Sequence, residues 1–458
     1  MIRFEPITLG TKTIFDRYAS RQVRNCDAAF ANIFCWQQTY HSSYAEAEGC
    51  FIVKYRVEGS KETAYMLLSP QFTARQLEAL LPELGKDAAA GGEQLRITGL
   101  PSDAAEIIRS SFHKKFACAE SRDTADYIYA ADDLRNLAGR RYQPKRNHLN
   151  RFNDLYNWSY EPLTAAHKDE CMQLENVWQS HHSDDTTIAA ERSAIERAFD
   201  NFEALGLAGG LLRIDGRPVA FTYGSPVNDQ TFDIHVEKAD TSFEGIFQAI
   251  NRMFAQHIPE QYEYINREED MGLDGLRRSK LSYHPAALEY KYTALALTDR
   301  EQGIARLWAE AFGDEEAFIE KFLVERRKYG VRSLTREVGG KPVAMLHIVP
   351  FVDEDGHRTA YIYGVATDPA YRRKGYATAL MDEAMELIRD DFDSAMLIPS
   401  GSEAARLYAK FGFIQSDMRI KFETESDFGT GCPENDKAMI ISFKDSETKT
   451  EAHLFSIR

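Results

Sequence analysis

The sequence lacks long hydrophobic runs and ordered cysteine motifs, and both absences restrict the class of protein. No apolar run among the 458 residues approaches the roughly 20 residues that a membrane-spanning helix needs, and the N-terminus has no apolar signal-peptide core. The six cysteines show neither C-x-x-C spacing nor neighbouring histidines, so neither a disulfide framework nor a metal site is indicated. We therefore expect a cytoplasmic protein with no membrane span and no metal.

Excess positive charge is also absent. The net charge of −16 argues against broad, non-specific binding to nucleic acid or to anionic membranes, although a local basic site remains open. A hydrophobic content of 43% and a charged content of 28% are typical of a globular protein. The length allows two to four domains.

The most informative segment lies near the C-terminus. Residues 361–366 form an apolar, β-rich run, and Asp368-Pro369 ends it. The turn and helix start that follow are Arg372, Arg373, Lys374, Gly375, Tyr376 and Ala377. Three cations at a helix N-terminus, where free N–H groups already favour anions, suit a pyrophosphate. Gly375 lets the backbone approach the phosphates, and Ala377 keeps the first turn free of bulky side chains. A solvated helix start is the alternative reading.

A second strand is expected at 394–398, followed by a helix from Ser402 that carries Tyr408 and ends at Gly412. This succession of strand, basic turn, helix, strand and helix resembles the GCN5-related N-acetyltransferase (GNAT) superfamily over residues 293–458. The resemblance assigns the basic turn to the pyrophosphate of acetyl-CoA, and Val365 and Thr367 to the strand that pairs with pantetheine. It also places Tyr408 at the position of a tyrosine that is often catalytic in this superfamily.

The chemistry of acyl transfer gives these residues roles. The acyl carbonyl must be polarised and the thiolate released. We expect the Val365 N–H to face the thioester oxygen and Tyr408 to protonate the departing sulfur. Because a thiol leaves tolerably without help, loss of Tyr408 should slow the reaction rather than abolish it. A core aromatic is the alternative for Tyr408, and no carboxylate is assigned as the base.

A similar succession of elements occurs earlier, between residues 204 and 266. At the position of the basic turn this segment has Phe243-Glu244-Gly245, with the glycine but no cations. Because Glu244 would repel a pyrophosphate, we do not expect coenzyme A to bind there.

Four phrases in this half carry a second resemblance: RNHLNRF from residue 146, DIHVEKA from 233, NREEDMG from 266 and LRRSKLSYHP from 276. They look like the phosphatidylglycerol lysyltransferase C-terminal-domain family, a tandem of GNAT-like folds, over residues 1–292. The resemblances predict an α/β (α+β) protein with three GNAT-like units at 1–138, 139–292 and 293–458. Each unit should be a mixed, mostly antiparallel sheet flanked by helices.

The second resemblance implies transfer of an aminoacyl group from charged tRNA to a lipid or another acceptor. The chain lacks the membrane domain of the lysyltransferases, which puts lipid modification in doubt. Basic residues could hold an anionic ligand, or they could form a solvated helix face. They are Arg140, Arg141, Lys145, Arg146, Arg151, Arg277, Arg278 and Lys280.

Acids beside an arginine, directly after a predicted strand, suggest a second polar site that could recognise a cationic amine. A helix-start acid cluster is the alternative. The candidate residues are Glu237, Asn266, Arg267, Glu268, Asp270, Arg277 and Lys280.

Three functional hypotheses follow. The leading one is acetyl-CoA-dependent N-acyltransfer to a small-molecule or peptide amine, catalysed by residues 293–458. The second is an aminoacyl-tRNA-dependent transferase in the N-terminal tandem. The third is a catalytically silent tandem that acts as a binding or scaffold module, which a cleft closed by side chains such as Phe243 and Phe247 would indicate. The oligomeric state does not follow from the sequence.

Overall fold

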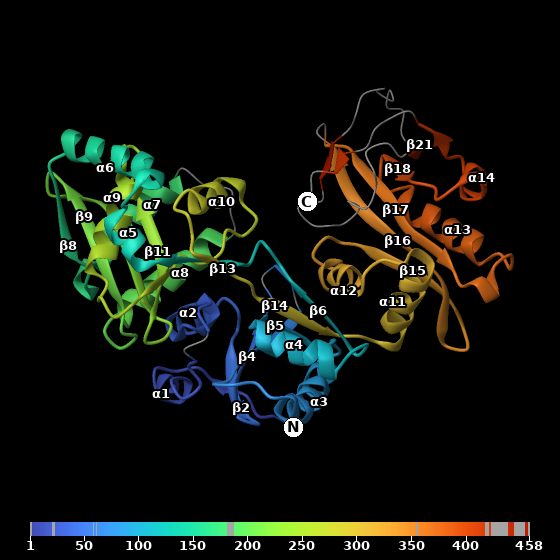
Figure 1. Cartoon of the computed structure of the whole chain (residues 1–458), viewed down its shortest axis with the longest axis horizontal. Coiled ribbons are helices and arrows are strands. Elements are labelled where there is room, and N and C mark those ends of the chain that lie inside the picture. Colours follow the sequence, from blue (N-terminus) through green and yellow to red (C-terminus); the bar gives the residue numbers. More distant parts are fainter. Residues whose placement is uncertain are drawn as a thin grey trace. The chain divides into compact units, whose positions relative to one another are not determined.

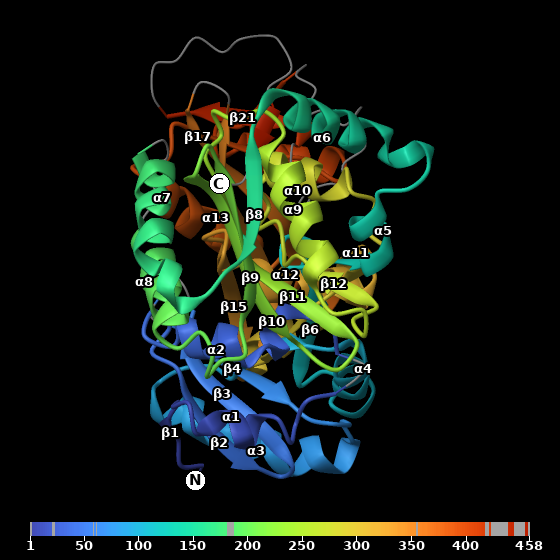
Figure 2. The same cartoon turned by 90° about the vertical axis from the view of Figure 1, so that its left-hand side faces the viewer.

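The chain forms three mixed sheets flanked by helices, the architecture expected of GNAT-like units (Figures 1 and 2). The computed structural model describes residues 2–20, 23–57, 59–60, 62–180, 187–353, 356–416, 421–422, 438–443 and 454–456. Two compact units result: unit 1 comprises residues 1–111 and 120–294, and unit 2 comprises residues 112–119 and 295–458. None of the described helices combines the length and apolar character that a membrane crossing requires.

The first sheet has the strand order β1-β2-β3-β4-β5-β14-β6. Its strands are β1 (Glu5–Pro6), β2 (Ser43–Ala47), β3 (Cys50–Arg56), β4 (Thr63–Leu68), β5 (Arg96–Leu100), β6 (Phe116–Glu120) and β14 (Tyr292–Ala296). The helices around it are α1 (Thr11–Phe15), η1 (Cys26–Ala28), α2 (Phe30–Trp36), α3 (Ala74–Ala90) and α4 (Ser102–Ser111).

The second sheet has the order β13-β7-β12-β11-β10-β9-β8. Its strands are β7 (Asp126–Ala130), β8 (Trp158–Pro162), β9 (Ala208–Ile214), β10 (Arg217–Pro226), β11 (Thr231–Ala239), β12 (Tyr264–Asn266) and β13 (Ala287–Glu289). Its helices are α5 (Ala131–Asn136), η2 (Arg140–Tyr142), α6 (Gln143–Leu155), η3 (Ala165–His167), α7 (Lys168–Ser180), α8 (Thr187–Asp200), α9 (Ile246–His257) and α10 (Asp274–Leu281).

Each of these two sheets contains a strand that lies beyond a predicted domain boundary. Strand β7 precedes residue 138 and belongs to the second sheet, whereas β14 extends past residue 292 and belongs to the first. One apolar cluster also joins Phe34 of α2 and Phe51 of β3 to Phe199 of α8. Unit 1 is therefore one body built on two sheets, and the division at residues 138 and 292 stays a prediction.

The third sheet has the order β19-β21-β18-β17-β16-β22-β20, and β15 pairs with β16. Its strands are β15 (Arg332–Val338), β16 (Lys341–Asp353), β17 (Arg358–Thr367), β18 (Ser394–Leu397), β19 (Ile414–Gln415), β20 (Lys421–Phe422), β21 (Met439–Ser442) and β22 (Leu454–Ser456). Its helices are α11 (Asp299–Phe312), α12 (Glu316–Glu325), η4 (Pro369–Tyr371), α13 (Tyr376–Ile388) and α14 (Ser402–Ala409). The predicted succession of strand, turn, helix, strand and helix is confirmed as β17, η4, α13, β18 and α14.

Candidate functional site

Strand β17 separates from its neighbour β18 halfway along its length. The two strands pair in parallel only at Thr359, Ala360 and Tyr361 of β17, which face residues 394–396. Strand β17 continues to Thr367, beyond the last pair. The backbone groups of its second half are therefore not engaged by β18 and can bind an extended ligand that carries amides.

A β-bulge lies in this diverging half. Met345 of β16 faces Ala366 and His347 faces Tyr363, so Gly364 and Val365 together oppose one residue of β16. Gly364 adopts a φ of 62°, the left-handed conformation that glycine tolerates. The predicted donor Val365 lies in this bulge, where the regular pairing of β17 with β16 is interrupted, and its role as donor stays a prediction.

The basic turn leads from β17 into α13. Arg373 and Gly375 both have left-handed backbones, with φ of 62° and 87°, and Gly375 is the N-cap of α13. A Cβ added to Gly375 would meet no atom within 4 Å. The turn is exposed, and Arg372 is fixed by a hydrogen bond of 3.3 Å from its Nε to the Thr367 carbonyl. This corner is open, cationic and at a helix start, as a pyrophosphate site requires.

Tyr408 lies on α14 and belongs to the apolar cluster of unit 2. Burial raises the pKa of its phenol to about 12. The hydroxyl therefore keeps its proton at neutral pH, which an acid catalyst needs. The catalytic role of Tyr408 stays a prediction.

His347 is a fully buried histidine beside the bulge. Its Nδ1 lies 2.8 Å from the Ser333 hydroxyl, and its ring stacks on Trp308 at 4.9 Å. Burial, reinforced by Arg326, lowers the pKa of His347 to about 3. The imidazole is therefore neutral in the folded chain.

This burial predicts acid sensitivity of unit 2. Below pH 6.5 the unfolded chain binds a proton at His347 that the folded chain refuses, so stability is lost as the pH falls from about 6.5 toward 3. The slope is up to about 1.4 kcal/mol per pH unit. Hydrogen exchange of α11 and β16 peptides between pH 7 and pH 5 would measure it, and His347→Gln should flatten the profile. An equally steep profile in that variant would contradict the assignment.

The corresponding turn of the second sheet is closed. Gly245 is the N-cap of α9 with φ 82°, the same conformation as Gly375. A Cβ there would lie 2.7 Å from the His148 carbonyl oxygen, because α6 packs on this turn, as the adjacent α6 and α9 in Figure 2 illustrate. The Tyr156 hydroxyl also accepts a hydrogen bond of 3.1 Å from the Glu244 N–H. Atoms of the chain therefore fill the space that corresponds to the open space beside Gly375.

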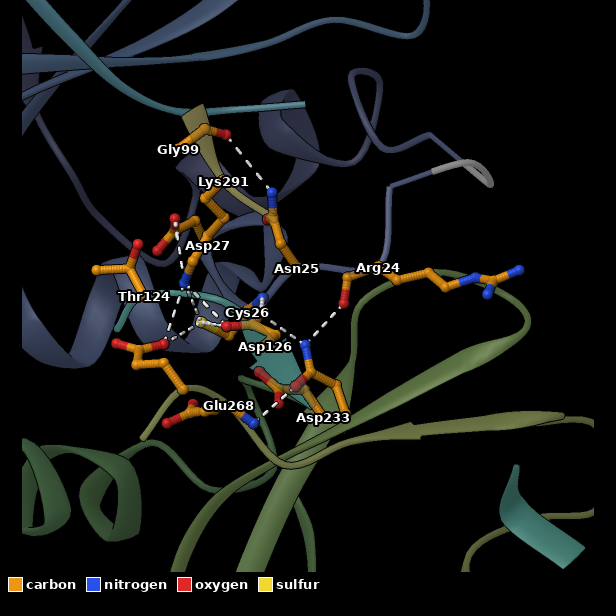
Figure 3. Close-up of polar contacts among 12 residues, drawn as sticks. Arg24, Asn25, Cys26, Asp27, Gly99, Thr124, Asp126, Asp233, Glu268 and Lys291 are labelled. Atoms are coloured by element: carbon orange, nitrogen blue, oxygen red, sulfur yellow. Dashed lines mark hydrogen bonds and ion pairs between the residues drawn. The ribbon is translucent and has the colours of Figure 1, made fainter. Parts of the chain in front are cut away.

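Unit 1 contains a buried polar cluster where η1, β7 and the loops after β12 and β13 meet (Figure 3). The Lys291 Nζ lies 2.9 Å from Asp126, 3.0 Å from Glu269, 3.7 Å from Asp27 and 3.3 Å from the Cys26 sulfur. Burial raises the pKa of Asp126 to about 8. Burial opposes ionisation of Glu269 too, but Lys291 outweighs it and lowers that pKa. One ammonium therefore compensates several buried acids.

A second group adjoins this cluster at a bulge in β11. Tyr223 of β10 faces Val236 and Gly224 faces Ile234, so His235 is the extra residue. Its Nδ1 lies 3.2 Å from Asp233 and 3.3 Å from Glu268. Burial would lower the pKa of His235, but the two carboxylates raise it to about 9, and burial together with Glu268 raises that of Asp233 to about 7.

The structure divides the predicted second-site residues among four places. Asn266 and Glu268 lie in the polar clusters described above. Arg267 pairs with Glu237 at 3.0 Å, and Lys280 donates to three carbonyls of residues 267–269. Asp270 binds Arg277 at 2.9 Å and Arg122 at 3.1 Å. The candidates therefore lie in several neighbouring contact groups, in which Lys280 and Arg277 contact the loop of residues 267–270, and their common role stays a prediction.

Most of the predicted basic residues are also held locally. Arg141 pairs with Asp133 at 2.7 Å and Arg151 with Glu244 at 2.8 Å. Arg146 donates to the carbonyls of residues 137 and 139. Lys145, Arg146 and Lys280 make side-chain hydrogen bonds but no ion pair, whereas Arg140 and Arg278 make neither kind of side-chain contact within the described part of the chain. The basic surface available to an anion is smaller than the sequence suggests.

Comparisons with known proteins match unit 1 and unit 2 to two different families. The model of the family described as "Phosphatidylglycerol lysyltransferase, C-terminal" matches residues 18–295, and that of the "Acetyltransferase (GNAT) family" matches residues 297–413. A crystal structure of a conserved protein of unknown function from Bacteroides thetaiotaomicron is 39% identical, with a TM-score of 0.61, and covers 65% of this chain and 100% of that one.

Two weaker similarities accompany these. An uncharacterized protein of Mycoplasmoides gallisepticum is 24% identical over 37% of this chain, which spans 55% of the length of that relative. The C-terminal domain of a putative lysylphosphatidylglycerol synthetase from Agrobacterium fabrum is 13% identical, with a TM-score of 0.46, over 64% of this chain and 93% of that one. Since the first family model matches more than half of its residues, the chain belongs to the phosphatidylglycerol lysyltransferase C-terminal family and carries a GNAT acetyltransferase-family domain behind it.

Proposed function

We propose that the GNAT domain of unit 2 is an acyl-CoA-dependent N-acyltransferase, with acetyl-CoA as the acyl donor and a small-molecule or peptide amine as the acceptor. The difference between the two glycine turns carries this proposal. Gly375 and Gly245 have the same backbone conformation at the same point of the fold. Only the Gly375 turn combines open space with cations, whereas α6 fills the other.

The residues of unit 2 have complementary roles in this reaction. Arg372, Arg373, Lys374 and the first N–H groups of α13, those of Tyr376 and Ala377, would hold the pyrophosphate. The free edge of β17 up to Thr367 would pair with the pantetheine amides. The Val365 N–H would donate to the thioester oxygen and stabilise the charge that develops there.

The transfer step is a direct attack. The amine nitrogen attacks the thioester carbon, the carbon–sulfur bond breaks, and the thiolate takes a proton from Tyr408. The attacking nitrogen loses a proton to solvent, and solvent returns a proton to the Tyr408 phenolate. Release of one free thiol per acylated amine, measured with a thiol reagent over a panel of amines, tests this function. A chain that binds coenzyme A yet releases no thiol with any amine would count against it.

Replacement of Tyr408 by phenylalanine tests its role. We expect kcat to fall by no more than about 100-fold, the low end of general-acid contributions, because a thiolate is a tolerable leaving group. KM for the acyl donor should change little, and the ring still fills the apolar cluster. Leu407→Met on the same helix is the matched packing control. An unchanged kcat in Tyr408→Phe would make Tyr408 structural.

A second candidate function concerns unit 1. The carboxylates beside His235 could recognise the ammonium of an aminoacyl group, and the family match favours aminoacyl-tRNA-dependent transfer. Under this candidate, Arg140 and Arg278 are the cations free to contact phosphate. Filter binding at low salt should then detect tRNA, and the double change of these arginines to alanine should reduce the salt slope by about one to two. Arg75→Ala, an exposed change elsewhere in unit 1, is the control. Absence of a tRNA complex at low salt would exclude this candidate.

A further inference from the structure

Three side chains of unit 1 offer metal-ligand atoms to a common point. These are the carboxylates of Asp233 and Glu268 and the imidazole of His235, whose ligand atoms lie within 4.8 Å of one another. The His235 Nδ1 is 3.2 Å from Asp233 Oδ2 and 3.3 Å from Glu268 Oε1. Two atoms at such separations, each about 2.1 Å from a shared centre, subtend an angle of about 100° there, which suits first-row metal coordination.

No lysine or arginine of the described residues balances the charges of this group, which leaves His235 as the cation beside the two carboxylates. Asp233 is fully buried, and no lysine or arginine within the described residues lies within ion-pair distance of Asp233 or Glu268. With a neutral imidazole, two negative charges would share one partly buried place. Buried carboxylates without a cation are costly, so the group requires either a proton on His235 or a divalent ion.

The neighbouring cluster shows how the chain compensates the negative charge of a similar set of side chains. Cys26, Asp126 and Glu269 also bring their ligand atoms within 4.8 Å of one another. There the Lys291 ammonium lies among all three, 2.9 to 3.3 Å from each. Since the chain's own cation occupies that position, it cannot also hold a metal. The His235 group has no such lysine.

Two further observations point to a ligand at the His235 group. The Oδ1 of Asp233 is buried and has no hydrogen-bond partner within the described chain. The other ring nitrogen of His235, Nε2, lies 2.8 Å from the Ser225 hydroxyl, the outer contact that typically orients a metal-bound histidine. Asn32 contacts both carboxylates through its amide, at 2.9 and 3.5 Å. Rotation of that amide would present an oxygen instead.

From this geometry we infer that Asp233, His235 and Glu268 form a binding site for one divalent transition-metal ion of the Zn²⁺ or Mn²⁺ type, with Asn32 as a further oxygen donor. One imidazole and two carboxylates suit these ions. Glu268 keeps 26% of its side chain exposed, which gives the ion a path from solvent. The Ser225 hydroxyl holds the imidazole so that Nδ1 faces the ion.

The test uses the full chain, stripped with a chelator and titrated with Zn²⁺ and with Mn²⁺ by calorimetry. Elemental analysis after dialysis gives the stoichiometry. We expect one ion per chain, with Zn²⁺ tighter than Mn²⁺. Glu268→Gln should weaken binding at least about 100-fold and Ser225→Ala about 10-fold, the range seen when the outer contact of a metal ligand is lost.

Three controls keep the inference falsifiable. His257→Gln, an exposed histidine of α9, should leave the affinity unchanged. Cys26→Ser should also leave it unchanged, because that cluster already contains Lys291. If Asp233→Asn does not fold, the partly exposed Glu268 variant still decides. A wild-type chain that retains neither ion, or equal affinity in Glu268→Gln, would overturn the assignment.

Discussion

Gly375→Glu should abolish measurable binding of coenzyme A to the full chain. The new side chain enters the space that lies open beside the turn, and its carboxylate meets the position of the pyrophosphate. It would also pair with Arg372, Arg373 or Lys374 and remove part of the attraction. We expect the Kd to rise at least 100-fold, a loss of about 2.7 kcal/mol or more. Isothermal calorimetry with coenzyme A measures this directly.

A matched substitution separates this effect from backbone strain. Gly340, in the turn between β15 and β16, has φ 74° and no atom within 4 Å of a built Cβ. Gly340→Glu therefore imposes the same left-handed strain, of about 1–2 kcal/mol, and the same added charge within unit 2. It should bind coenzyme A normally. Equal affinity in Gly375→Glu and the wild type would remove the basis of the proposed acyltransferase.

The strand, turn and helix that form the corner proposed to bind acyl-CoA could be predicted from sequence because they are contiguous. The strand at 361–366, the basic turn and the helix after Gly375 follow one another within a few dozen residues, and each has a local signature. The bulge at Gly364 and Val365 was not predicted as a bulge. Its register depends on strand β16, which the turn motif does not include.

The polar clusters of unit 1 could not be predicted in this way. Cys26, Asp126, His235 and Lys291 come from four segments that are far apart in the chain, and no local motif shows that they meet. The sequence pattern instead singled out the acids and cations that follow β12 as one site. Several of those, such as Asp270 and Arg277, pair with each other because they lie on one short loop and helix.

The closed turn at Gly245 shows the same limit. The missing cations and Glu244 predict a poor anion site, but they do not predict that helix α6 covers the turn. Arg151 of α6 also pairs with Glu244, so the acid that stands in this turn contacts the helix that covers it.

Lys291→Met should cost unit 1 about 3–5 kcal/mol, the range found when one partner of a buried ion pair is removed. The ammonium contacts Asp126, Glu269 and Asp27, and its side chain is 6% exposed. Methionine has a similar shape, so the change removes charge rather than volume. Against a typical stability of 5–15 kcal/mol, the loss is large. Urea unfolding monitored by hydrogen exchange of β7 and α2 peptides would measure it.

The pH dependence of this variant distinguishes charge loss from poor packing. Without Lys291 the buried carboxyls hold their protons more tightly in the folded chain than in the unfolded one, since burial raises their pKa values. Their protonated forms then stabilise the fold at low pH, so the deficit should be smaller at pH 5 than at pH 8. Lys168→Met, which breaks the exposed pair with Asp200, should cost less than about 1 kcal/mol. Two results would mean that the ammonium does not compensate the buried acids. One is a loss of unfolding free energy in Lys291→Met as small as in this control, and the other is a loss that does not change with pH.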